Sequence, residues 1–148
     1  MALGRLFPDA ELHAVEINPE ACTRLRELLP AEHVTEGSIL DVDPGGGFDL
    51  VLVKGVLIHL PPDSLPVAYR RAVESTTRHL LICEYYNPTP VEVPYRGERE
   101  RLFKRDFCGE ILDQHPDMRL VDYGFVYRRD PSFPLDDITW FLLEKRVA

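Results

Sequence analysis

Short apolar runs alternate with amphipathic stretches in the first part of the chain. The run at residues 12–17 is rich in branched side chains and indicates a strand. Residues 20–29 have apolar side chains three and four positions apart, which predicts a helix that ends at Pro30. Pro19 suits the first turn of this helix, where its missing N–H costs nothing. A short strand is expected around residues 33–36.

Two near-continuous apolar runs, at residues 48–53 and 79–84, are typical of parallel strands buried on both faces. The glycines at 45–47 feed the first of these strands, and we interpret them as a linker. A helical pattern from about residue 62 to residue 77 connects the two runs. The order strand, helix, strand, strand, helix, strand predicts a largely parallel α/β sheet.

The second part of the chain has a different pattern. Residues 91–104 are polar, aromatic and basic, and a helix is expected at 106–114. Two late strand patterns, at 119–127 and 138–145, are joined by a charged loop that contains prolines, and they predict an antiparallel hairpin at the sheet edge. Residues 1–8 have the pattern of a helix end and the turn that leaves it. We predict a single domain over residues 1–148.

Polar or glycine-containing turns follow three of the expected strands. Glu16 ends the first strand, the turn at 37–41 follows the second, and Lys54 and Gly55 follow the third. In open α/β sheets, ligands bind beyond the carboxyl ends of the strands. A carboxylate at that position can accept hydrogen bonds from both hydroxyls of a nucleotide ribose. The alternative for Glu16 is an ordinary surface acid at the end of a buried strand.

Composition narrows the range of functions. The chain has 148 residues, of which 45% are hydrophobic and 28% charged, as is typical of a globular domain. Its net charge of −8 argues against non-specific nucleic-acid binding, which requires a basic face. No apolar run approaches the roughly 20 residues of a membrane span, and residues 1–8 lack the apolar core of a signal peptide. These features predict a cytoplasmic protein that acts on a small molecule, with neither nucleic acid nor membrane as partner.

The three cysteines, Cys22, Cys83 and Cys108, are odd in number and far apart. They have none of the paired spacings of zinc sites, so we interpret them as reduced thiols that pack in the core. No metal site is predicted.

The three strand-end signals, in their order and spacing, resemble the class I S-adenosylmethionine-dependent methyltransferases, a Rossmann-like fold whose sheet ends in an antiparallel hairpin. Six motifs across the chain resemble a narrower family, the pseudaminic acid biosynthesis-associated methylases. These motifs are residues 15–19 (VEINP), 54–59 (KGVLIH), 84–88 (EYYNP), 94–97 (PYRG), 102–107 (LFKRDF) and 137–141 (DITWF). The resemblance implies S-adenosylmethionine as cofactor and a small acceptor, an anionic sugar or a nucleotide sugar.

The resemblance also implies roles for individual residues. Glu16 is expected to bind the ribose hydroxyls, and Ile17 is expected to pack against adenine. The turn after the next strand contacts the adenine ring, with Asp41 as a further candidate, and the loop at 54–59 faces the methionine end of the cofactor. The expected cofactor-binding residues are therefore Glu16, Ile17, Ser38, Ile39, Lys54 and Gly55.

The chain departs from the family pattern at its beginning. Such enzymes start with a strand and a loop of the form acid-x-Gly-x-Gly, whose backbone N–H groups hold the methionine part of the cofactor. This sequence begins near the end of the helix that follows the loop. We therefore predict an N-terminally truncated domain with weak or absent cofactor binding. Two strand edges would then stay unpaired or pair with each other.

The candidate catalytic residues are His59, Tyr85 and Tyr86. His59 lies just past a strand end, and its unperturbed pKa suits a general base for an acceptor hydroxyl. The alternative is a histidine that caps or packs at the start of the next helix. Tyr85, Tyr86 and Asn87 end a strand and are expected to line the acceptor pocket. The alternative for the two tyrosines is a place at the edge of the core.

Arg96, Arg101 and Lys104 lie in the main local excess of positive charge, together with Arg99 and Arg105. Arginine grips carboxylates and phosphates bidentately, which would suit an anionic substrate. The alternative is a solvated helix face on which Glu98 and Glu100 pair with these cations.

Two functions from other classes remain open at this point. A non-catalytic remnant of the fold would act as a binding or structural module, and its exposed sheet edge would favour association. A dinucleotide-dependent dehydrogenase or epimerase would also place an acid after the second strand, although the late hairpin and motifs speak against it. The sequence gives no prediction of the oligomeric state.

Overall fold

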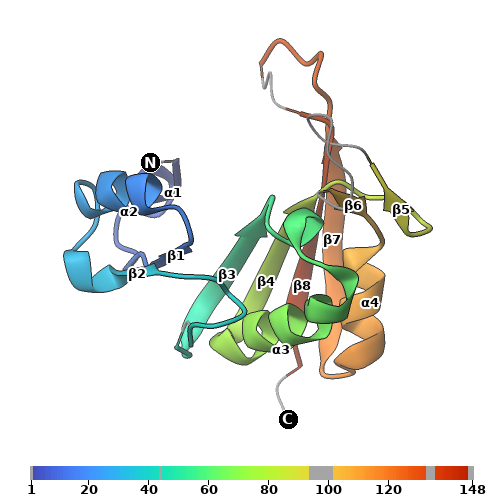
Figure 1. Ribbon diagram of the computed structural model, residues 1–148, viewed down its shortest axis with the longest axis horizontal. Helices are drawn as coiled ribbons and strands as arrows, with labels where there is room; N and C mark the ends of the chain where they lie inside the picture. The colour runs from blue at the N-terminus through green and yellow to red at the C-terminus, as the bar shows by residue number, and fades with distance from the viewer. Residues whose placement is uncertain (1, 44, 94–101, 133–135, 147–148) are drawn as a thin grey trace. The chain divides into compact units, whose positions relative to one another are not determined.

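The computed structural model describes residues 2–43, 45–93, 102–132 and 136–146 (Figure 1). The chain divides into two compact units, residues 1–44 and 45–148. The division falls at the glycine segment that the sequence analysis interpreted as a linker. In the described residues, the first unit has one two-stranded sheet, and the second unit has a four-stranded and a two-stranded sheet.

The first unit contains α1 (Ala2–Leu6), β1 (Ala14–Glu16), α2 (Pro19–Arg26), a 3₁₀ turn (Ala31–His33) and β2 (Val34–Glu36). β1 and β2 are parallel, and Glu16 at the end of β1 is the register partner of Glu36 at the end of β2. Among the described residues of this unit, Cys22 on α2 and Val34 on β2 are buried. The Cys22 thiol donates to the Glu16 carbonyl oxygen at 3.2 Å, which attaches the helix to the strand.

α2 begins where the sequence predicts it and ends earlier. The Asn18 side chain accepts hydrogen bonds from the backbone N–H groups of Glu20 at 2.9 Å and Ala21 at 3.2 Å, and Pro19 occupies the first turn. The helix ends at Arg26, before Pro30. Leu28, which the predicted helix over residues 20–29 includes, therefore lies beyond the last helical turn, and its side chain is 62% exposed.

The second unit is built on a four-stranded sheet in the order β3-β4-β8-β7 (Figure 1). These strands are β3 (Phe48–Lys54), β4 (Thr76–Glu84), β7 (Met118–Val126) and β8 (Ile138–Lys145). Only β3 and β4 are parallel, and β8 runs antiparallel to both of its neighbours. The C-terminal hairpin at the sheet edge is thus confirmed. The sheet is mixed rather than largely parallel, because β8 enters between β4 and β7.

In the described part of this unit, α3 (Leu65–Ser75) and α4 (Phe107–Gln114) are joined by a hydrogen-bond network. The Tyr69 hydroxyl on α3 donates to the Glu110 carboxylate on α4 at 2.7 Å, and Arg105 Nε donates to the other oxygen of that carboxylate at 2.7 Å. Leu80 and Ile82 of β4 are fully buried with them. This helix-covered face holds the core of the unit.

The opposite face of β3 is only partly covered. Leu50 and Leu52 are each 37% exposed, whereas Val53 on the helix-covered face is buried. The prediction that residues 48–53 are buried on both faces is therefore wrong. The apolar run shows only that the side chains on both faces of the strand are apolar. It does not show that other elements pack against both faces.

The segment between β4 and α4 contains structure that the sequence analysis missed. β5 (Val91–Glu92) pairs antiparallel with β6 (Phe103–Lys104), in strands of two residues each. The three cysteines are free thiols; Cys22 and Cys108 are buried in the core as predicted, whereas Cys83 is only partly buried. Within the described ranges, no helix is long and apolar enough to span a bilayer.

Candidate functional site

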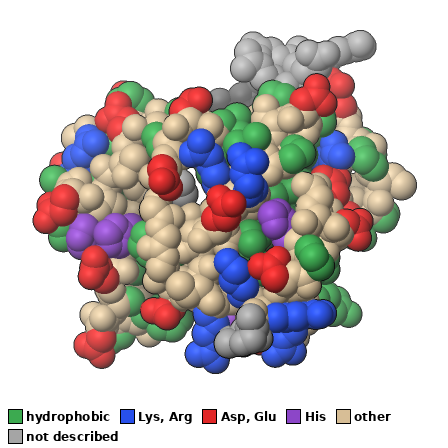
Figure 2. All heavy atoms as spheres, turned by 90° about the horizontal axis from the view of Figure 1, so that it is seen from below, with side chains coloured by type: hydrophobic (Ala, Val, Ile, Leu, Met, Phe, Trp, Pro, Cys, Tyr) green, Lys and Arg blue, Asp and Glu red, His purple; other side chains and the backbone are tan. Residues whose placement is uncertain are grey.

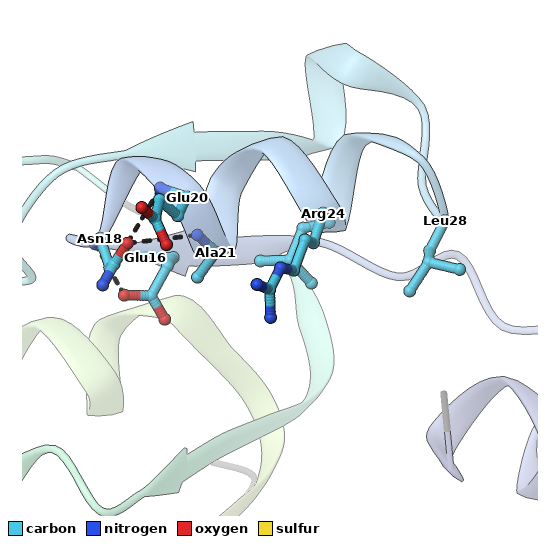
Figure 3. A pocket seen from close by; sticks show the side chains of 7 residues that line it. Glu16, Asn18, Glu20, Ala21, Arg24 and Leu28 are labelled. Atoms are coloured by element: carbon cyan, nitrogen blue, oxygen red, sulfur yellow. Dashed lines mark hydrogen bonds between the residues drawn. The ribbon is translucent and has the colours of Figure 1, made fainter.

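Glu16 lies at one end of a pocket of about 370 Å³ in the first unit (Figure 3). Its carboxylate oxygen Oε1 accepts a hydrogen bond from the Asn18 backbone N–H at 2.8 Å. Among the described residues, Oε2 has no such partner, so it can accept from a ligand. The rest of the pocket is formed along α2, and the lining residues are Glu16, Asn18, Glu20, Ala21, Arg24, Leu25 and Leu28.

The turn after β2 is attached directly to the end of β1. The Gly37 N–H donates to the Glu16 carbonyl oxygen at 2.9 Å. Gly37 has a φ of +153°, and a side chain there would place Cβ 2.4 Å from a Val42 methyl group, so glycine is required. This turn therefore places Ser38 and Ile39 next to the strand end that carries Glu16.

Ser38 has a structural role in that turn. Its hydroxyl oxygen accepts from the Leu40 N–H at 3.1 Å, and its carbonyl oxygen accepts from the Val42 N–H at 2.9 Å. Ile17 is 68% exposed directly after Glu16, so its side chain is available to an aromatic ring of a ligand. The adenine contacts of Ile17, Ser38 and Ile39 stay predictions.

In the second unit, the loop after β3 is held by a residue that sequence analysis did not single out. Glu84, the last residue of β4, accepts hydrogen bonds from the backbone N–H groups of Val56 at 2.8 Å and Leu57 at 3.0 Å. Its side chain is 4% exposed, and burial raises its pKa to about 7 against the opposing effect of these N–H groups. Oε2 of Glu84 is buried without a hydrogen-bond partner in the described part of the chain.

Lys54 and Gly55 begin this loop. Gly55 has a φ of +64°, in the left-handed region that favours glycine, and its N–H donates to the Cys83 carbonyl oxygen at 3.1 Å. His59 ends the 3₁₀ turn Leu57–His59 that follows, and its side chain is exposed. The methionine-end contacts of Lys54 and Gly55 and the catalytic role of His59 stay predictions.

The three polar residues at the end of β4 point to different partners. The Tyr85 hydroxyl donates to Asp136 at 2.6 Å, and Lys104 Nζ lies 5.1 Å from the centre of the Tyr85 ring. The Asn87 amide donates to the Thr89 carbonyl oxygen at 2.6 Å, so Asn87 stabilises its own turn. Tyr86 lines a pocket of about 440 Å³, together with Tyr123, Gly124, Phe125, Thr139 and Phe141.

The structure describes only part of the basic cluster near residue 100. Arg96, Arg99 and Arg101 lie outside the described residues. Lys104 contacts the Tyr85 ring, and Arg105 is occupied by Glu110. The substrate-binding roles of Arg96, Arg101 and Lys104 therefore stay predictions.

No protein-family model and no curated protein matches the sequence. The fold, in contrast, is similar to that of solved S-adenosylmethionine-dependent methyltransferases. The 1,6-didemethyltoxoflavin-N1-methyltransferase of Burkholderia thailandensis, with bound S-adenosylhomocysteine, gives a TM-score of 0.72 at 19% identity, over 96% of this chain and 64% of that chain. The N-methyltransferase NodS of Bradyrhizobium japonicum, also with S-adenosylhomocysteine, gives 0.68 at 17% identity, over 95% and 70%.

A third similar structure is the magnesium protoporphyrin IX methyltransferase of Synechocystis with bound S-adenosylmethionine. It gives a TM-score of 0.61 at 15% identity, over 92% of this chain and 60% of that chain. At these identities the comparisons show the fold, which is that of the S-adenosylmethionine-dependent methyltransferases. The chain spans 64%, 53% and 46% of the length of three of the matched structures.

Proposed function

We propose that this chain takes part in the S-adenosylmethionine-dependent methylation of a small molecule, and that Glu16 binds the ribose of the cofactor. The observation that carries the proposal is the position of the Glu16 carboxylate, at the carboxyl end of β1 and facing a pocket. The similarity to methyltransferases solved with S-adenosylmethionine or S-adenosylhomocysteine supports the same cofactor class.

The chemistry of the pocket fits a ribose. The Asn18 N–H fixes one carboxylate oxygen of Glu16, which orients the other toward the pocket without filling it. A carboxylate accepts from both ribose hydroxyls, and hydrogen bonds to a charged acceptor are stronger than those between neutral groups. In this proposal the exposed Ile17 side chain covers one face of adenine, and the turn at Ser38 and Ile39 lies beside it.

The cofactor, when bound, supplies a methyl group on a positively charged sulfur. The protein then has to orient donor and acceptor in line and, for a hydroxyl acceptor, to remove one proton. In this proposal His59, whose exposed imidazole follows the end of β3, accepts the proton from the acceptor hydroxyl. Tyr86 and its aromatic pocket are the proposed place for the acceptor in the second unit.

The finer proposal for the acceptor is an acidic sugar or a nucleotide sugar. It rests on the resemblance of six sequence motifs to the pseudaminic acid biosynthesis-associated methylases and on the basic residues near residue 100. Among the described basic residues, we propose that Lys104 binds the anion. Its ammonium group lies over the Tyr85 ring.

The ribose proposal is tested with backbone NMR, because this technique detects binding even in the millimolar range. S-adenosylhomocysteine is titrated into the chain, and the expected amide shifts follow the ends of β1 and β2. Glu16→Gln should weaken binding by about tenfold or more, since it removes a charged acceptor. Glu36→Gln is the matched control, because Glu36 ends the neighbouring strand in register with Glu16.

A second ligand makes the test specific for the ribose. 2′,3′-Dideoxyadenosine lacks the 2′- and 3′-hydroxyls that Glu16 is proposed to bind, so it should bind wild type and Glu16→Gln equally, whereas adenosine should distinguish them. Equal weakening by Glu16→Gln and Glu36→Gln, or shifts away from these strand ends, would contradict the proposal.

A further inference from the structure

Two histidines stand side by side at the amino ends of the strands in the first unit. Ala14 and Val34 are the first register partners of the parallel strands β1 and β2, so His13 and His33 precede that pair at equivalent positions. Parallel neighbours in register lie about 4.8 Å apart, which brings their side chains together. The two imidazole rings are stacked with their centres 4.0 Å apart and their planes at 21°.

Glu11 completes a cluster of three potential ligands. Its oxygen Oε1 lies 2.8 Å from His13 Nε2 and 3.5 Å from His33 Nε2. All three ligand atoms lie within 4.8 Å of one another. Two ligands of a tetrahedral zinc ion are about 3.3 Å apart, so the distances to the carboxylate oxygen already match the edges of such a polyhedron.

The environment of the cluster suits metal binding. The His33 side chain is 20% exposed and that of His13 34%, whereas Glu11 is open to solvent. His33 Nδ1 is buried without a hydrogen-bond partner in the described ranges, so the polar contacts of this ring are concentrated at Nε2. On the face drawn in Figure 2, histidine side chains gather over the N-terminal unit, at the left, with acidic side chains beside them.

We propose that Glu11, His13 and His33 form a binding site for a divalent transition-metal ion of the zinc type. The ligands are Nε2 of each histidine and a carboxylate oxygen of Glu11, with water in the fourth position. Two imidazoles and one carboxylate favour zinc over magnesium or calcium, which prefer oxygen ligands. Because the ring planes are nearly parallel, the more exposed His13 ring rotates about its Cβ–Cγ bond when the ion binds.

The site would join the two strands where they begin. β1 and β2 have three residues each, and a two-stranded sheet of this size is only marginally stable by itself. An ion held by His13 and His33 stabilises the paired form by mass action. The proposed ribose contact of Glu16 lies at the opposite, carboxyl end of β1, so the two proposals are independent.

The test uses the full chain without a histidine tag. Zinc is titrated by calorimetry, and cobalt is titrated by visible absorption, which reports the coordination geometry. We expect one ion per chain, release of protons on binding, and binding weakened at least about tenfold by each of Glu11→Gln, His13→Gln and His33→Gln. His79→Gln is the matched control: His79 lies 3.6 Å from Glu144, a histidine–glutamate pair without the stacked second ring.

A measurement on the wild-type chain tests the metal site even if one of the variants does not fold. Nitrogen-15 spectra of the imidazoles should show zinc shifting Nε2 of His13 and His33, with His79 and His115 unchanged. Absence of binding by wild type, or equal affinity in the three variants and the control, would overturn the site. Neither outcome affects the ribose titration with S-adenosylhomocysteine, so the two proposals fail separately.

Discussion

Glu84 accepts a hydrogen bond from the backbone N–H of Val56 at 2.8 Å, although 28 residues separate the two. This contact fixes the loop after β3 to the end of β4. The same carboxylate oxygen also accepts from Leu57, so one buried acid holds two N–H groups at the start of a 3₁₀ turn. The arrangement makes the loop conformation depend on a titratable group.

The raised pKa of Glu84 predicts how stability depends on pH. Burial moves this pKa from 4.5 to about 7, so the folded chain binds the proton more tightly than the unfolded chain does. The resulting stabilisation is fully present below pH 4.5 and is lost as the pH rises through 7. The free energy of unfolding should therefore decrease by up to about 3 kcal/mol over this range.

Glu84→Gln isolates this contribution. Glutamine keeps an acceptor oxygen for Val56 and Leu57 but does not titrate, so the difference in stability between wild type and variant should change with pH. Urea unfolding at pH 5 to 8, followed by fluorescence of the single tryptophan, Trp140, measures it. Parallel pH profiles for the two proteins would show that Glu84 does not titrate in this range.

Tyr69→Phe should destabilise the second unit. The Tyr69 side chain is 1% exposed, and its hydroxyl donates to Oε2 of the Glu110 carboxylate. Removing the hydroxyl leaves that carboxylate oxygen without its partner, which typically costs about 1–3 kcal/mol. Urea unfolding checks the value, and Tyr123→Phe, at an exposed tyrosine, should leave the midpoint unchanged. Equal effects of the two substitutions would contradict the network between α3 and α4.

Gly124→Ala should disturb Trp140 directly. A Cβ atom at residue 124 would lie 2.6 to 2.8 Å from three atoms of the indole ring, closer than packed side chains allow. Gly124 and Trp140 are register partners on β7 and β8, so either the indole ring has to move or the two strands have to separate at this position. We expect a loss of about 1–3 kcal/mol and a shift in the fluorescence of Trp140.

Gly46→Ala is the control for this clash. Its added Cβ would meet its nearest neighbour, the Glu74 carbonyl oxygen, at 3.8 Å, an ordinary contact. The control should unfold and fluoresce like wild type. An unchanged spectrum in Gly124→Ala would mean that the indole is not packed against residue 124.

Asn18→Ala should loosen the start of α2. It removes the side-chain acceptor for the backbone N–H groups of Glu20 and Ala21 and should cost about 1 kcal/mol of helix stability. Faster amide hydrogen exchange at these two residues measures the loss. Asn18→Asp retains an acceptor and places a negative charge at the helix start, so it should restore protection. A lack of rescue would indicate that the cap is not what protects these amides.

Local signals explain most of what could be predicted from the sequence. Asn18 and Pro19 mark the beginning of α2, and Asp106 marks that of α4, because a capping side chain acts within its own turn. The C-terminal hairpin is evident because both strands are long. The strands of β5 and β6 were missed, because two residues each in a polar, charged stretch carry no period.

Contacts between distant positions could not be predicted in this way. In the sequence, Glu84 and Glu16 look alike, because each is an acidic residue at the end of an apolar strand pattern. The structure separates them: Glu16 faces a pocket, whereas Glu84 is buried against a loop that precedes it by 28 residues. His13 and His33 likewise become neighbours only through the register of two parallel strands.

The position of β8 has a consequence for synthesis of the chain. Ile138–Lys145 leaves the ribosome after β4 and β7, yet it lies between these two strands in the sheet. Until it emerges, both of those strands present an open edge that can pair with another nascent chain. Productive folding of the second unit is therefore delayed until nearly all of its residues have been translated, and this interval is the one in which a chaperone would protect it.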